Sequence, residues 1–245
     1  GPKHALTLCT MRNLALKSQA AGDLKRAIPL FEKTLKLRTE TLGPNHSDTL
    51  SSMGNLGSAY FFRVGERKRG LPLLEKAVEL LTAKSDPDYQ SVLAFTCDLA
   101  NAYEQTGDLK RVVLLREKVL KLRIAKLGPE HRDTLASMYI LAKTYRRLGD
   151  LKRAFPLLEK TLKLRTEKLG TNDIDTLNSM GNLALAYKLS GDLKRAIPLY
   201  EKAIKLREAT LGLDDPGTLI TMYNLAIAYR TAGDLKRAVS LGEKT

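Results

Sequence analysis

The stretch Gly-Asp-Leu-Lys-Arg-Ala at residues 191–196 recurs along the chain, and this recurrence decides the fold. Successive copies lie 42 residues apart, except for one interval of 43 residues between Gly22 and Gly65. A constant period of this length indicates an array of repeats, in which each unit packs on its neighbours and not on one central core. The copies, close or divergent, begin at Gly22, Gly65, Gly107, Gly149, Gly191 and Gly233.

One repeat, residues 170–211, contains the signals of two helices. Asp175 precedes apolar residues at helical spacing and can cap the start of a first helix. Gly191 suits the left-handed position just beyond the end of that helix, and Asp192 can cap a second one. A second apolar stripe then continues as far as Leu211. The sequence therefore predicts an all-α fold built from antiparallel helix pairs.

The period predicts one array over residues 1–245, and its last repeat is incomplete. Residues 234–245 stop well short of the matching stretch 192–211, so we expect the sequence to be a fragment of a longer protein. Gly1 and Pro2 either fit the repeat's own loop or are an expression remnant. The expected repeats are approximately 1–42, 43–85, 86–127, 128–169, 170–211 and 212–245.

Prolines fall about six residues into four of the second helices. An interior proline removes a backbone hydrogen bond, so we expect a local bend at each. The positions are Pro29, Pro72, Pro156 and Pro198.

The composition indicates a packed, basic protein. Hydrophobic residues make up 43% of the chain, and 41 Lys and Arg against 27 Asp and Glu give a net charge of +14. Such an excess favours acidic partners, without distinguishing nucleic acid, membrane and protein. No apolar run approaches the roughly 18 residues of a membrane span, and the chain does not begin with a secretory signal. With only Cys9 and Cys97, a reducing cytoplasmic compartment is expected.

The repeat resembles a known family. Met-x2-Leu-Ala-x2-Tyr at residues 180–187, followed by Ala-x3-Tyr at residues 196–200, resembles the tetratricopeptide signature with methionine in place of its tryptophan. The 42-residue period and Leu-Gly-Pro-x-His-x-Asp-Thr-Leu at residues 42–50 and 127–135 resemble the kinesin-light-chain type of this repeat. The second copy departs from it, with Ser-Asp-Pro-Asp at residues 85–88. The resemblance implies an α-solenoid wound as a right-handed superhelix, whose first helices line a concave groove for an extended peptide.

A row of polar residues precedes the recurring leucine of the first helix. In members of the family, asparagines here bond the backbone of a bound peptide, because an amide offers both donors and an acceptor. The alternative is that each asparagine bridges neighbouring helices. Asp98 and Ile140 interrupt the row. Its members are Asn13, Asn55, Asp98, Ile140, Asn182 and Asn224.

The next two groove-facing slots vary between copies, whereas the framework slots barely change. Variation confined to these slots indicates that their residues contact a ligand. The alternative is that they lie on a surface without a function, where the sequence can change freely. The first of them holds Leu16, Ser58, Asn101, Lys143, Leu185 and Ile227. The second holds Gln19, Phe61, Glu104, Arg146, Lys188 and Arg230.

Two clusters stand out among these residues. Phe61 and Phe62 either form an apolar pocket or fill the altered turn beside the inserted residue. A basic cluster on the groove side of copies four to six would attract carboxylates. A peptide with acidic residues around an aromatic or leucine anchor would suit both clusters, and it also resembles the peptide class read by kinesin light chains. The basic residues are Lys143, Arg146, Arg147, Lys188 and Arg230.

No arrangement of residues points to catalysis, a metal or a cofactor. His4, His46 and His131 occupy the same loop slot in separate copies, so loop packing or capping is expected of them. Cys97 has no nearby base that would activate it as a nucleophile. The chain lacks a Gly-rich phosphate loop, an HExxH motif and a CxxC pair. The sequence therefore predicts a protein without enzymatic activity.

The leading hypothesis is a protein–protein interaction module, an adaptor that binds an extended, acidic peptide. The rival is RNA binding by a helical-repeat array, which the net charge supports. Against it, the groove offers few aromatic rings for stacking on bases, and much of the positive charge falls on the outer second helices. A third possibility is a regulatory appendage of a neighbouring enzyme. The candidate stacking residues are Phe61, Phe62, Tyr139 and Tyr223.

Overall fold

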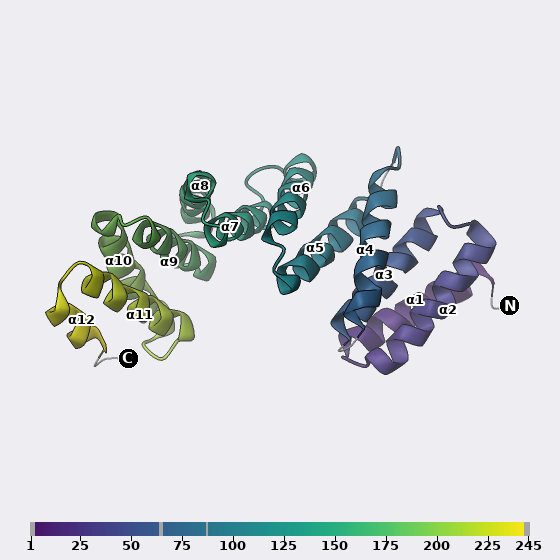
Figure 1. The fold of residues 1–245 in the computed structure, drawn as a ribbon, viewed down its shortest axis with the longest axis horizontal. Coiled ribbons are helices and arrows are strands. Elements are labelled where there is room, and N and C mark those ends of the chain that lie inside the picture. Colours follow the sequence, from purple (N-terminus) through teal and green to yellow (C-terminus); the bar gives the residue numbers. More distant parts are fainter. Residues whose placement is uncertain (1–2, 64–65, 87, 243–245) are drawn as a thin grey trace. The chain divides into compact units, whose positions relative to one another are not determined.

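The computed structural model describes residues 3–63, 66–86 and 88–242, which form twelve helices and no strand. Successive helices pack as antiparallel pairs, as predicted (Figure 1). Gly1, Pro2 and Gly65 lie outside the described residues. The helices are α1 (Ala5–Ala20), α2 (Leu24–Leu42), α3 (Ser47–Phe62), α4 (Arg67–Thr82), α5 (Tyr89–Thr106), α6 (Leu109–Leu127), α7 (Arg132–Arg147), α8 (Leu151–Leu169), α9 (Ile174–Leu189), α10 (Leu193–Leu211), α11 (Pro216–Thr231) and α12 (Leu235–Gly242).

The chain divides into two compact units, Gly1–Leu122 and Arg123–Thr245, called unit 1 and unit 2. In unit 1, α1 pairs with α2 and α3 with α4, while α2 also packs on α3 and α4 on α5. In unit 2, α7 pairs with α8, α9 with α10 and α11 with α12. The first helices of successive repeats are also neighbours there, because α7 contacts α9 and α9 contacts α11.

Local capping explains where the helices begin and end. The Asp192 side chain accepts a hydrogen bond from Arg195 N at 3.1 Å and caps α10, and Gly191 has the left-handed φ of 82° that the turn before it requires. The prediction was wrong by two residues at the start of α9. There Asp173 is the cap, and its carboxylate accepts from Asp175 N at 2.8 Å.

The loop histidines cap helices, as expected. Their Nδ1 atoms accept hydrogen bonds from the backbone N–H two residues onward: His4 from Leu6, His46 from Asp48 and His131 from Asp133, at 3.3, 3.1 and 3.2 Å. Each imidazole therefore satisfies one of the unpaired donors at a helix start.

The second helices run without interruption through their prolines. Pro29, Pro72, Pro156 and Pro198 are all exposed within α2, α4, α8 and α10. A proline on a solvent-facing side leaves the unpaired carbonyl of the preceding turn where water can reach it. This position limits the cost of the lost hydrogen bond.

Arginines link three of the second helices, α2, α6 and α8, to the next repeat. In unit 2, Arg165 donates from Nη1 to Asp175 O and to Ser179 Oγ, both at 2.9 Å, and it is 3% exposed. Arg38 and Arg123 make the same pair of contacts with the residues ten and fourteen positions onward. The recurring Lys-Leu-Arg of these helices was the signal for this link, and the sequence reasoning did not use it.

No described helix combines the length and the apolar character that crossing a membrane would require.

Candidate functional site

The predicted site residues fall into two groups, one in each unit. Unit 1 holds the asparagine-row members of the first three copies, the neighbouring Asn101 and the phenylalanine pair; unit 2 holds the basic residues with the last two asparagines. The structure thus collects the predicted basic cluster in one compact unit. The groups are Asn13, Asn55, Phe61, Phe62, Asp98 and Asn101 in unit 1, and Lys143, Arg146, Arg147, Asn182, Lys188, Asn224 and Arg230 in unit 2.

In unit 1 the row residues differ in their exposure. Asn13 and Asn101 are exposed on α1 and α5. Asn55 is only 8% exposed, and its Nδ2 has no hydrogen-bond partner among the residues that the structure describes. Asp98 accepts a hydrogen bond from Ser58 Oγ at 2.5 Å, and burial raises its pKa although that bond lowers it. The Ser58–Asp98 pair joins α3 to α5, which is the bridging role that was weighed for the row.

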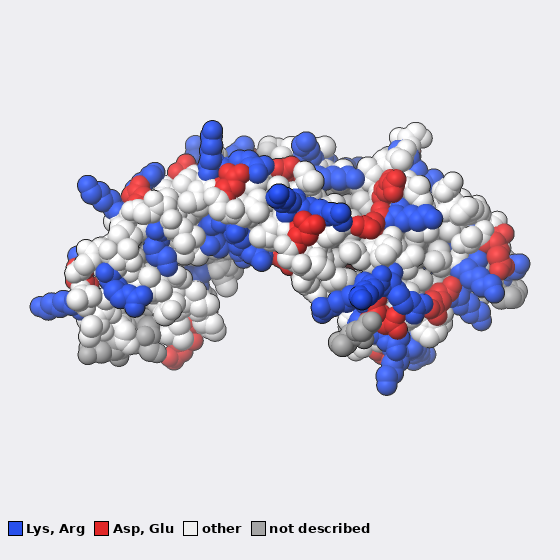
Figure 2. All heavy atoms as spheres, viewed as in Figure 1, with Lys and Arg blue, Asp and Glu red and all other residues white. Residues whose placement is uncertain are grey.

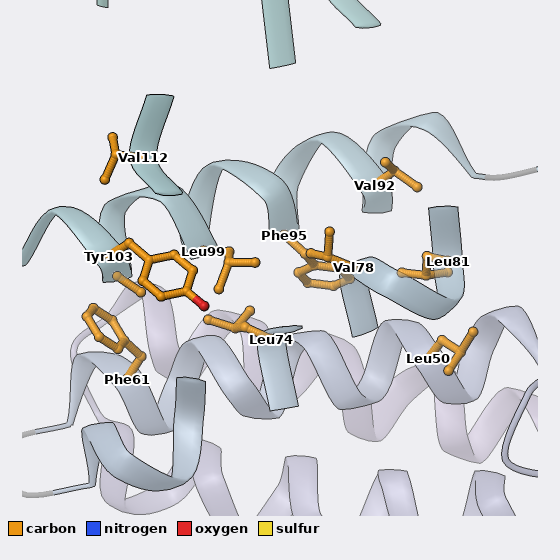
Figure 3. Close-up of a cluster of buried hydrophobic side chains, with 11 residues drawn as sticks. Leu50, Phe61, Leu74, Val78, Leu81, Val92, Phe95, Leu99, Tyr103 and Val112 are labelled. Carbon is orange, nitrogen blue, oxygen red and sulfur yellow. The ribbon is translucent and has the colours of Figure 1, made fainter. Parts of the chain in front are cut away.

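The two phenylalanines have different environments. Phe61 is 2% exposed and packs with Leu74, Leu99 and Tyr103 in the core between α3, α4 and α5 (Figure 3). Phe62 is 49% exposed, and its ring meets that of Phe61 edge-on at 5.8 Å. Phe61 therefore fills the interior and is not available to a ligand, so the packing interpretation holds for it.

Unit 2 contains a cavity of about 230 Å³ between α9, α10 and α11. Asn182 and Asn224 both line it. Tyr200 also lines it, and the buried Tyr200 hydroxyl has no hydrogen-bond partner among the described residues. The other lining residues are Asn178, Gly181, Leu185, Arg207, Gly217, Ile220 and Thr221.

Both asparagines of the cavity bond their own helix. Asn182 Nδ2 donates to Asn178 O at 3.0 Å and to the Tyr139 hydroxyl at 2.5 Å. Asn224 Nδ2 donates to Ile220 O at 2.9 Å, and its Oδ1 accepts from Lys188 Nζ at 2.9 Å. In both cases the bond to the carbonyl four residues back holds the amide beside the cavity. The Asn182–Tyr139 bond also bridges α9 and α7.

Two cations beside the cavity lack an acidic partner among the residues that the structure describes. Arg146 and Lys188 are half-buried on α7 and α9, and neither forms an ion pair. Burial lowers the pKa of Arg146. Burial and then the charge of Arg146 lower the pKa of Lys188. Burial raises the pKa of Tyr200, and the charge of Arg146 partly opposes this effect.

The remaining basic residues are arranged differently. Lys143 is half-buried, with its Nζ 5.3 Å from the centre of the Tyr139 ring. Arg147 is exposed at the end of α7, and Arg230 is exposed on α11. Lysines are also spread over the outer second helices, and Figure 2 shows basic and acidic side chains interspersed on one face. Lys194 and Lys202 of α10, for example, are exposed and unpaired.

Of the lining residues, the sequence reasoning placed only Asn182, Leu185 and Asn224 on the groove side, and it missed the other seven, among them Gly181, Tyr200 and Arg207. Tyr200 belongs to the repeat signature and was read only as framework. Arg207 is 4% exposed and contacts Asp215 Oδ2 at 3.3 Å and Asn178 Oδ1 at 2.5 Å. Gly181 is the signal that could have been used, because the slot before the asparagine row changes in size from copy to copy. Among the described residues, no three His, Cys, Asp or Glu side chains are grouped as a metal would require.

The chain matches a family model and several solved structures. The model, described as tetratricopeptide repeat, matches residues 6–68, 115–167, 141–209 and 175–245. Among curated proteins, no sequence matches.

The structural neighbours include kinesin-light-chain-like repeats. A single-residue variant of nearly identical TPR-like repeats from Podosopora anserina, described as a candidate kinesin light chain, has 28% identity and a TM-score of 0.70, covering 83% of this chain and 95% of its own. BtubC (BKLC) from P. vanneervenii has 19% identity and a TM-score of 0.68, covering 90% and 89%. YrrB, described as a TPR protein with an unusual peptide-binding site, has 20% identity and a TM-score of 0.55, covering 85% and 88%. The last two likenesses establish a shared fold.

Proposed function

Because the chain belongs to the tetratricopeptide repeat family, whose fold serves as a scaffold for protein–protein interaction, we propose that unit 2 binds an extended acidic peptide at the cavity between α9 and α11. The observation that carries the proposal is the pair Arg146 and Lys188, two half-buried cations without a carboxylate partner. A partly desolvated cation is costly unless an anion pairs with it, so this pair favours a ligand that supplies carboxylates.

The cavity suits a peptide better than a free small molecule. Its volume of about 230 Å³ lies below the roughly 300–1,000 Å³ typical of small-molecule sites. Leu185 and Ile220 give it apolar walls beside polar groups, so it can accept one anchoring side chain while the flanking acidic residues meet the cations. Asn182 Oδ1 accepts no hydrogen bond from another described residue and could accept one from a peptide N–H.

The experiment compares two double variants that remove the same charge. Arg146→Gln with Lys188→Gln removes the cations beside the cavity, and Lys194→Gln with Lys202→Gln removes two exposed charges from α10. The probes are fluorescein-labelled Glu-Glu-Tyr-Glu-Glu and Glu-Glu-Leu-Glu-Glu, measured by fluorescence anisotropy. Since truncating a partly desolvated charge pair costs about 2 kcal/mol or more, the first variant should bind at least about tenfold more weakly.

The control variant should stay within about twofold of the wild type, because exposed charges act only weakly and are screened by salt. Equal losses in the two variants would mean that the peptides respond to net charge alone, and the proposal would be wrong. A labelled RNA oligonucleotide of mixed sequence serves as the second probe. Sub-micromolar RNA binding with a steep dependence on salt concentration would favour the RNA interpretation instead.

A further inference from the structure

The residue immediately before each member of the asparagine row is tyrosine in two copies, glycine in two, and arginine or cysteine in the other two. This slot, called here the ring slot, lies on the first helix of each repeat beside the position of the buried arginine. Because the repeats are similar, the contacts of a residue in one copy can be compared with those of the residue in the same slot of the next copy. The ring slot holds Arg12, Gly54, Cys97, Tyr139, Gly181 and Tyr223.

The fourth copy shows what an aromatic residue does in the ring slot. The Tyr139 ring lies over the guanidinium of Arg165, with 4.8 Å between the ring centre and Cζ. Its hydroxyl accepts a hydrogen bond from Asn182 Nδ2 of the next repeat at 2.5 Å. Tyr139 is thereby held at both ends: a cation faces the ring and an amide N–H reaches the oxygen.

The fifth copy has the same residue types in the slots of the arginine and the asparagine, without the ring. Gly181 stands 42 residues after Tyr139, Arg207 stands 42 after Arg165, and Asn224 stands 42 after Asn182. All three line the cavity. Among the described residues no aromatic ring lies over Arg207, whose guanidinium instead contacts Asp215 Oδ2 and Asn178 Oδ1.

The space at Gly181 is open, unlike the space at the other glycine of the ring slot. A Cβ built on Gly54 would lie 2.5 Å from the ring of Phe95, so a neighbouring side chain already fills that position. A Cβ built on Gly181 would meet only Thr221 Oγ1, at an ordinary 3.8 Å. The cavity at Gly181 is therefore a position without a side chain that no other described residue fills.

We propose that this cavity is a subsite for a tyrosine side chain of the bound partner, with its ring against Arg207 and its hydroxyl accepting a hydrogen bond from Asn224 Nδ2. Asn224 can supply that bond, because Nδ2 carries two hydrogens and uses one on Ile220 O. Lys188 can only donate, so its contact with Oδ1 fixes which end of the Asn224 amide bears the donors.

Tyr200 also lines the cavity and is 1% exposed, and its hydroxyl has no hydrogen-bond partner among the described residues. The inference rests on the proposed peptide-binding function and adds to it the identity of one recognised side chain.

The first experiment probes the cavity without a peptide. Titration of the whole ¹⁵N-labelled chain with p-cresol, the side-chain analogue of tyrosine, should shift the amide signals of Gly181 and Asn224. In the Gly181→Tyr variant, which places in the fifth copy the residue that the fourth copy carries, these shifts should disappear. Gly181→Ala is the control and should retain them, because its Cβ fits. Circular dichroism establishes that both variants are folded.

The second experiment tests selectivity with Glu-Glu-Tyr-Glu-Glu and its Phe and Leu counterparts. Loss of one hydrogen bond should weaken the Phe peptide about two- to tenfold. Loss of the ring as well should weaken the Leu peptide about tenfold or more. Gly181→Tyr should reduce binding of the Tyr peptide to the level of the Leu peptide.

The outcomes separate the two proposals. If the Leu and Tyr peptides bind equally, or if Gly181→Tyr binds the Tyr peptide as the wild type does, the tyrosine subsite is refuted while peptide binding stands. If p-cresol shifts Gly181 and Asn224 but acidic peptides bind no better than Ala-Ala-Tyr-Ala-Ala, the subsite stands and the acidic ligand is refuted. If p-cresol shifts neither residue, the subsite is refuted whatever the peptides do.

Discussion

Replacing Arg165 tests whether the buried arginines stabilise the array. Arg165→Leu is the informative change, because Leu81 occupies the same slot in the second copy and is fully buried there. The substitution removes two hydrogen bonds from a charged donor, each contributing about 1.5–3 kcal/mol, and the contact with the Tyr139 ring, about 1 kcal/mol. Against this loss, a guanidinium no longer has to leave water, which costs several kcal/mol.

The two acceptors of Arg165 also keep other partners. Ser179 Oγ donates to Asp175 O at 2.9 Å, so neither oxygen is left entirely unpaired. We therefore expect Arg165→Leu to lower the free energy of unfolding by about 2 kcal/mol. Arg165→Ala should lower it by about 4 kcal/mol because it also leaves a cavity.

Urea unfolding of the whole chain, followed by far-ultraviolet circular dichroism, measures these differences. Amide hydrogen exchange in the first turns of α9 should localise the loss, because the arginine pairs with that segment. Lys163→Leu is the matched control, since Lys163 is exposed on the same helix and should change stability by less than about 0.5 kcal/mol. Unchanged or increased stability of Arg165→Leu would refute the reasoning, because burying the guanidinium would then cost as much as its bonds contribute.

Two further predictions concern titration in unit 1. Burial raises the pKa of Asp98, so the stability that this carboxyl group contributes is complete below its unfolded pKa of about 3.9 and is lost as the pH rises through its folded pKa. Asp98→Asn should therefore raise the free energy of unfolding at neutral pH. In urea titrations, the decline of that free energy above about pH 4 should be smaller in this variant than in the wild type. Burial, followed by the hydrogen bond to Glu32, raises the pKa of Tyr60 to about 12. The stability that the Tyr60 hydroxyl contributes is therefore complete below its unfolded pKa of about 10 and is lost as the pH rises through the folded pKa of about 12. The ultraviolet difference titration of wild type minus Tyr60→Phe should show a step near pH 12, and a step near the ordinary tyrosine value of about 10 would contradict the structure.

The sequence predicted the helix pairs because their signals are local. Gly191 and Asp192 act within a few residues of themselves, so a turn and a cap can be read without knowing what packs nearby. The start of α9 was misplaced because Asp173 and Asp175 can both accept the same kind of bond, and the loop before them decides which one does. The histidine caps were predictable for a different reason, since repetition of one residue in one loop slot excluded a shared metal site.

The candidate site was harder to predict because its residues act through distant neighbours. Phe61 shares its slot with Lys188 and Arg146, yet packing against Tyr103 of the following repeat buries it. Asn182 was considered both as a peptide contact and as a bridge between helices, and its Nδ2 bonds Asn178 O of its own helix and the Tyr139 hydroxyl of the preceding repeat. Periodicity identifies which residues share a slot, whereas contacts 40 or more residues apart decide whether that slot is open.

The difference between the fourth and fifth copies suggests how such an array can vary its binding while keeping its fold. Tyr139 and Gly181 lie on α7 and α9, which are both 16 residues long, are capped by a side chain at the equivalent position (His131 and Asp173) and pair with the following helix. A ring in this slot joins two repeats through Arg165 and Asn182, whereas a glycine leaves the corresponding arginine and amide facing a cavity. Because these contacts are between neighbouring repeats only, the cost of opening one slot should stay local. On this argument, a partner binds at the slot of Gly181 by inserting the aromatic side chain that Tyr139 supplies in the fourth copy.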